Sequence, residues 1–127
     1  MYLPIVGNAQ VLKERRVYYL DCSYSMDSLG LWNKVRDNLN RAIDNINDET
    51  TEIVVISFAD NTSKNPTSKP IKEFATSSGK NKLKAHISAL PKPDTNTMTY
   101  HYIPINDFDK NRVCEDCITY MFFMTDG

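Results

Sequence analysis

Three short apolar runs divide the chain. They cover residues 17–20, 52–59 and 117–124, and each is nearly continuous in β-branched, aromatic and other apolar residues. This pattern is typical of strands in a parallel sheet that is covered on both faces, because such strands have no solvent-facing side. The runs therefore predict three buried strands, of which the first is central.

An amphipathic segment separates the first two runs. Over residues 31–47, apolar positions recur every three or four residues and so share one side of a helix: Val35, Leu39, Ala42, Ile43 and Ile46. A strand, a helix and a strand in this order predict a βαβ unit, with parallel strands and a right-handed crossover. The polar residues 27–30 predict a turn before the helix.

The other segments have weaker patterns. Residues 71–75 predict a short edge strand that pairs antiparallel, because a loop and not a helix connects it to the preceding strand. A second helix is expected over residues 80–90, and Pro91 ends it. Residues 98–111 stay ambiguous, because Pro104 is incompatible with the middle of a regular helix.

Together these elements predict one α/β domain over residues 1–127. The expected architecture is a mostly parallel central sheet with an antiparallel edge strand and helices on both faces. The composition agrees with this, since 41% of the residues are hydrophobic and 24% are charged, as in ordinary globular proteins.

Charge and hydropathy exclude several kinds of partner. The formal net charge is −1, from 15 basic and 16 acidic residues, and no basic patch indicates nucleic-acid binding. No apolar run approaches the roughly 18–20 residues that span a bilayer. Residues 1–10 have no features of a secretory signal. We therefore expect a cytoplasmic protein with no nucleic-acid or membrane partner.

Two of the three cysteines form a single C-x-x-C motif. Cys114 and Cys117 lie just before the third apolar run, and no second pair is present to complete a zinc ribbon. This favours a structural or incidental role over a redox or metal-binding one.

Oxygen-bearing side chains follow the apolar runs. Asp21, Ser23 and Ser25 come directly after the first run, Asp126 follows the third, and Thr95 lies on a loop between them. In parallel α/β sheets, ligands gather outside the carboxyl ends of the strands, where the strand order reverses. Two carboxylates and three hydroxyls are hard donors that suit Mg²⁺ or Mn²⁺. The alternative for the serines is that they cap the next helix or satisfy turn amides.

The same residues carry a family resemblance. Residues 21–26, with the sequence DCSYSM, resemble the D-x-S-x-S signature of von Willebrand factor A (vWA) domains. Residues 94–96 resemble the threonine loop of that family, and residues 123–127 resemble its strand ending in T-D-G. The pieces occur in the order of the family, and residues 52–59 are similar to its second strand. The resemblance implies a Rossmann-like vWA fold.

The resemblance also implies a metal-ion-dependent adhesion site (MIDAS). Ser23 and Ser25 would be direct ligands, and Thr95 would bind directly or through water. Asp21 and Asp126 would hold coordinated waters and orient the hydroxyls. The implied cation is Mg²⁺ or Mn²⁺ ahead of Ca²⁺. A cation held mainly by neutral oxygens stays electrophilic and can accept a carboxylate from a partner protein. The implied function is a non-catalytic protein-interaction module.

Two other functions stay open at this point. A metal-dependent hydrolase or phosphotransferase would use the same oxygen cluster to polarise a phosphate or water, but it would need a positioned base or lysine. A structural domain with a vestigial site is the other alternative.

The chain also departs from the family pattern. Residues 93–94 are Pro-Asp where the family has a pair of glycines. A vWA domain continues beyond T-D-G with two further strands, whereas this sequence ends at Gly127, so the C-terminal strands are expected to be missing. Residues 118–124 would then form an exposed, apolar edge strand. Three explanations stay open: the chain is a truncated product of a longer protein, the strand pairs with another chain, for example in self-association, or further sequence covers it.

Overall fold

The computed structural model describes residues 13–59, 69–91, 93 and 100–125. Within these residues four strands form one sheet in the order β3-β2-β1-β4. The strands are β1 (Glu14–Asp21), β2 (Thr51–Phe58), β3 (Ile71–Phe74) and β4 (Ile118–Met124). β1 pairs parallel with both β2 and β4, whereas β3 pairs antiparallel with β2. The prediction of a mostly parallel sheet with an antiparallel edge strand is confirmed.

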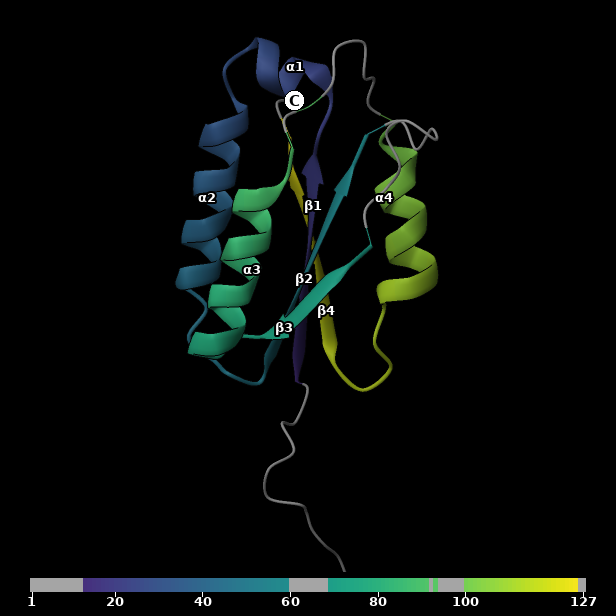
Figure 1. Ribbon diagram of the computed structural model, residues 1–127. Helices are drawn as coiled ribbons and strands as arrows, with labels where there is room; N and C mark the ends of the chain where they lie inside the picture. Colours follow the sequence, from purple (N-terminus) through teal and green to yellow (C-terminus); the bar gives the residue numbers. More distant parts are fainter. Residues whose placement is uncertain (1–12, 60–68, 92, 94–99, 126–127) are drawn as a thin grey trace, which may run out of the picture.

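Helices cover both faces of this sheet, as predicted (Figure 1). The helices are α1 (Tyr24–Ser28), α2 (Trp32–Asp44), α3 (Ser77–Ala89) and α4 (Tyr102–Asp107), and α4 continues into a π-helical turn, η1 (Phe108–Arg112). α2 and α3 pack side by side on one face, and α4 lies on the other. None of the helices in the described ranges is long and apolar enough to cross a membrane.

The two faces of β1 belong to two hydrophobic cores. Tyr18 and Leu20 lie in the core beneath α2 and α3, whereas Val17 and Tyr19 lie in the core beneath α4. Side chains of a strand alternate between faces, so a strand between two helical layers must be apolar at every position. This explains why the run at residues 17–20 has no polar interruption.

β1 begins three residues earlier than its apolar run. The first three residues of the strand, residues 14–16, are charged, yet Glu14 and Arg15 pair in register with β2. The Arg15 side chain donates a hydrogen bond to Glu52 on β2, with 2.6 Å between Nε and Oε1. Cross-strand pairing of opposite charges therefore extends the strand where hydrophobicity does not.

The turn predicted at residues 27–30 is only partly correct. The chain first forms α1, a helix that the sequence did not indicate, and turns only at Leu29 and Gly30. Gly30 has a φ of 69°, a left-handed conformation that glycine adopts without steric cost.

α4 resolves the ambiguity around Pro104. Pro104 is the third residue of the helix, where the backbone N–H would have no partner within the helix in any case. The proline is therefore compatible with a helix that begins at Tyr102. Pro104 made residues 98–111 ambiguous because the sequence does not show that the helix starts only two residues before it.

A disulfide joins Cys114 and Cys117 in the connection between η1 and β4. The two sulfurs bond each other, so neither is available as a thiolate metal ligand in this state.

Candidate metal site at the carboxyl ends of β1 and β4

The candidate site begins where β1 ends. Asp21 is the last residue of β1 and is fully buried, and the next backbone N–H, that of Cys22, donates to the Phe58 carbonyl of β2 at 2.8 Å. The chain then leaves the sheet and starts α1. β1 lies between β2 and β4 in the sheet. The chain continues from β1 to β2 and β3 on one side and later adds β4 on the other side, so the strand order reverses at β1.

Asp21, Ser23 and Ser25 are brought together at this point. The Ser23 backbone N–H donates to Asp21 Oδ1 at 2.8 Å. The hydroxyl oxygens of Ser23 and Ser25 are 3.2 Å apart and share a hydrogen bond. One buried carboxylate and two adjacent hydroxyls thus occupy a single turn of backbone.

The capping alternative does not account for Ser23. Ser23 is the N-cap residue of α1, with an extended backbone (φ −74°, ψ 161°), but its side chain makes no capping hydrogen bond to the helix. The hydroxyl turns instead toward Ser25. An N-cap serine normally bonds the backbone N–H two or three residues on, and the Ser23 side chain makes no such bond.

Thr125 is a fourth member of the cluster that sequence reasoning did not single out. Its hydroxyl donates to Asp21 Oδ2 at 2.7 Å, so the end of β4 is tied directly to the end of β1. The available signal was its place immediately after an apolar strand, in the same T-D-G segment as Asp126. Asp21 therefore accepts a hydrogen bond on each oxygen, which fixes its plane.

Thr95 and Asp126 lie outside the described residues, so their membership of the site stays a prediction. The chain on the far side of the Thr95 loop is anchored close by, because the Tyr100 backbone N–H donates to the carbonyl of Ala59 at 3.1 Å. Ala59 directly follows β2. Tyr100 therefore lies at the edge of the sheet where β2 ends.

Cys22 lies between the ligand candidates but has different chemistry. Burial raises the pKa of its thiol to about 12, and the negative charge of Asp21 acts in the same direction. The thiol is therefore protonated at neutral pH, which makes it a poor nucleophile and a poor metal ligand.

The donor set fits a hard divalent cation. Across the described ranges, no three His, Cys, Asp or Glu residues gather as a metal cluster, so the oxygen donors here are mainly hydroxyls. Ser23 is 2% exposed and Asp21 is fully buried, and a cation beside them would offset the cost of burying the carboxylate. Neutral hydroxyls and a carboxylate suit Mg²⁺ or Mn²⁺.

The fold is a Rossmann-like α/β fold, in which helices cover both faces of a mostly parallel sheet. No family model matches the sequence, and no curated protein sequence matches it. Among solved structures, the fold is similar to that of proximal thread matrix protein 1 from the mussel byssus, solved with a zinc-occupied MIDAS motif. The TM-score is 0.60 at 14% sequence identity. The match covers 89% of this chain and 29% of that one, so this chain spans less than a third of the mussel protein.

Proposed function

We propose that the protein is a metal-dependent protein-interaction module of the MIDAS type. The observation that carries this proposal is the pairing of the Ser23 and Ser25 hydroxyls beside a fully buried Asp21 at the switch point of the sheet. Ser23 and Ser25 would hold the cation directly, Thr95 would bind it directly or through water, and Asp21 and Asp126 would hold coordinated waters. When bound, the cation supplies a coordination position for an acidic side chain of the partner protein.

The residues around the site prepare it for this role. Asp21 is held on both oxygens, by Ser23 and by Thr125, so its carboxylate is fixed before any cation arrives. The Ser23 and Ser25 oxygens already lie within one hydrogen bond of each other. A preorganised set of ligands binds with a smaller loss of conformational entropy.

We propose Mg²⁺ or Mn²⁺ as the resident cation. The mussel structure carries zinc in its MIDAS motif, which supports a divalent cation at this site. Zinc prefers nitrogen and sulfur ligands, however, whereas the donors in this chain are hydroxyl and carboxylate oxygens, which favour harder ions.

The proposed function includes no catalysis. The Cys22 thiol is protonated at neutral pH, and His86 is exposed on α3, on the face of the sheet opposite α4. Neither residue suits the base that a hydrolase or phosphotransferase would need. His101, the second histidine of the sequence, lines a pocket together with Thr125, so it is the base candidate that activity assays must test. Phosphatase and nuclease assays with Mg²⁺ and Mn²⁺ test this point, and turnover that is lost in Asp21→Ala would contradict it.

Titration calorimetry with Mg²⁺ and Mn²⁺ tests the metal site itself. The double variant Ser23→Ala/Ser25→Ala should abolish binding, because it removes both direct hydroxyl ligands. Thr125→Val should weaken binding by about 10-fold or more, since the orienting partners of metal ligands typically contribute 10- to 100-fold. Ser78→Ala, at an exposed serine in the first turn of α3, is the matched control and should bind as the wild type does.

Two results would overturn the proposal. The wild type could fail to bind either metal at millimolar concentration, which would favour a vestigial site. Alternatively, the double variant could bind as tightly as the wild type, which would place the metal elsewhere.

A second contact surface is the free side of β4. Among the described strands, β4 pairs only with β1 and so ends the sheet. Ile118 and Tyr120 on this strand are exposed. We propose that a second copy of the chain pairs here, because an uncovered apolar edge strand has unpaired backbone groups that favour association.

A further inference from the structure

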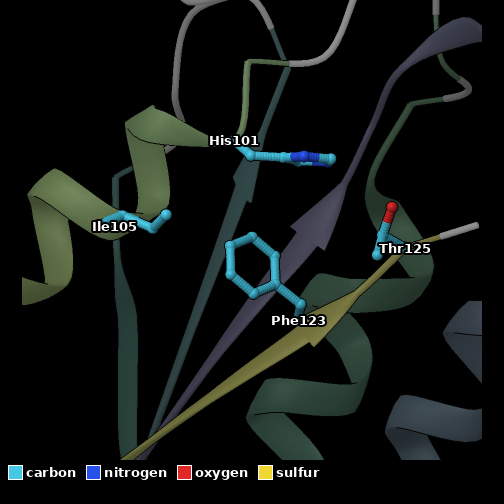
Figure 2. A pocket seen from close by; sticks show the side chains of 4 residues that line it. All are labelled: His101, Ile105, Phe123 and Thr125. Atoms are coloured by element: carbon cyan, nitrogen blue, oxygen red, sulfur yellow. The ribbon is translucent and has the colours of Figure 1, made fainter. Parts of the chain in front are cut away.

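A pocket of about 340 Å³ opens between α4 and the end of β4. Among the described residues, its lining comes from His101, Ile105, Phe123 and Thr125 (Figure 2). The Phe123 ring projects from β4 between His101 and Ile105, and the His101 ring meets it edge to face at 5.8 Å between centroids. The volume lies at the lower end of the roughly 300–1,000 Å³ of ligand pockets. It has room for one large side chain.

The lining of this pocket is mainly apolar and accessible from outside. Ile105 is 53% exposed and Phe123 is 38% exposed, which is high for side chains that could pack against each other in a closed core. Burying such surface is favourable by about 25 cal/mol per Å², so the pocket is a binding surface for an apolar group.

Thr125 belongs both to this pocket and to the metal site. It lines the pocket, while its hydroxyl donates to Asp21 Oδ2 at 2.7 Å. The pocket therefore lies directly beside the oxygen cluster, at the same edge of the sheet. A partner segment that places a carboxylate at the metal would carry its neighbouring side chain over the pocket.

We propose that this pocket recognises an apolar side chain, aromatic or branched aliphatic, adjacent to the acidic residue of the partner. This inference rests on the proposed function and adds its specificity: the cation selects the carboxylate, and the pocket selects the residue next to it. Ile105 and Phe123 supply the apolar contact area, and His101 supplies an aromatic wall with nitrogen atoms for a polar backbone group.

Three capped peptides separate the two parts of the recognition. The first, acetyl-Phe-Asp-Phe-amide, offers a carboxylate with apolar neighbours. The second, acetyl-Gly-Asp-Gly-amide, keeps the carboxylate alone, and the third, acetyl-Phe-Asn-Phe-amide, keeps only the apolar groups. Each is titrated into the whole protein with saturating Mg²⁺ and again with EDTA, and backbone amide NMR shifts give the affinity and the location.

The first peptide should bind about tenfold more tightly than the second in Mg²⁺, as expected for burying one apolar side chain. Its shifts should include His101, Ile105 and Phe123. The third peptide should shift the same amides weakly, with and without Mg²⁺. Equal affinity of the first two peptides, or shifts that avoid these amides, would overturn the proposal that this pocket recognises the apolar side chain.

A pair of variants provides a second, independent test. Ile105→Phe fills the pocket and should abolish the preference for the first peptide over the second, with no change in binding of the second. Val113→Phe adds the same ring at an exposed residue outside the pocket lining, and should leave the preference intact. An unchanged preference in Ile105→Phe would contradict the proposal.

These outcomes distinguish a failure of the pocket proposal from a failure of the metal-site proposal. If the metal proposal fails, binding of the first two peptides is unaffected by EDTA, while the third still marks the pocket amides. If the pocket fails, the second peptide still binds in a manner that depends on Mg²⁺.

Discussion

Tyr19 and Asp107 hold the helix that forms one wall of the pocket. Tyr19 is fully buried in β1, and its hydroxyl donates to Asp107 Oδ2 at 2.5 Å. Arg112 donates to both oxygens of Asp107, at 2.9 Å from Nε and 3.1 Å from Nη2. This network ties α4 and η1 to the central strand of the sheet. A buried hydroxyl in this position stabilises the fold only because its partner is present.

The network predicts a stability that depends on pH. Burial alone would raise the pKa of Asp107, but hydrogen bonds from Arg112, Tyr19 and Asn111 outweigh burial and hold the pKa below its usual range. A lowered pKa in the folded state contributes stability above the unfolded pKa of about 4 and loses it as the pH falls toward the folded value.

Asp107→Asn should therefore lower the free energy of unfolding by about 1–2 kcal/mol at pH 7. The difference from the wild type should shrink as the pH falls below about 4, because protonation of Asp107 then removes the same charge. Urea unfolding at pH 7 and pH 3 measures both values. Asp109→Asn, at an exposed acid in η1, is the control, and a deficit that stays constant with pH would contradict the prediction.

At the scale of elements, the start of α3 shows how tightly a helix can meet the sheet. Thr76 caps α3, because its hydroxyl oxygen accepts from the Gly79 backbone N–H at 3.0 Å. Gly79 lies against the end of β3, so close that an added Cβ would come within 2.1 Å of the Phe74 carbonyl oxygen. The helix begins at Ser77, within the residues 77–79 that were expected to open it, and the cap and the glycine both belong to the docking contact.

Gly79→Ala should lower the free energy of unfolding by about 1–3 kcal/mol, although alanine is the better helix former. The clash is with backbone, which cannot rotate away as a flexible side chain would. Ser78→Ala, one residue earlier and exposed, should change stability by less than about 0.5 kcal/mol. Denaturant melts of the two variants measure the difference, and equal stability would show that α3 and β3 shift apart at no cost.

At the scale of the whole molecule, β4 is the strand through which we expect the protein to meet other chains. It joins the metal site through Thr125 and the pocket through Phe123, and its outer side ends the described sheet. The face of β4 toward α2 and α3 is only partly covered, since Tyr18 stacks on Phe122 at 4.7 Å while Tyr120 stays exposed.

We expect the protein to form dimers as its concentration rises, through pairing of β4. Size-exclusion chromatography with light scattering measures this directly. Tyr120→Lys should shift the protein to monomer, because a lysine on an edge strand opposes pairing. Val113→Lys places the same charge at an exposed residue just before β4 and should not. A wild type that is monomeric at every concentration would count against the idea.

The sequence by itself determined the sheet, because a strand covered on both faces must be apolar at every position. Residues 17–20 and 52–59 satisfy that requirement, and the periodicity of residues 31–47 fitted a helix on one face. Residues 117–124 share the pattern, but β4 ends the described sheet and exposes Ile118, Tyr120 and Phe123, so their apolar pattern did not reveal this exposure. It also indicated that Asp21, Ser23 and Ser25 follow a strand end, where parallel sheets collect ligands. These are local properties, each visible within a short window of the chain.

Only the tertiary structure decided which distant residues complete these features. Thr125 reaches Asp21 across 104 positions of sequence, and the Tyr19 hydroxyl finds Asp107 across 88. The beginning of α4 around Pro104 and that of α3 beside Phe74 also depended on where each helix met the sheet. Local patterns carry no information about such partners, because the contact energy arises only when the strands have been brought side by side.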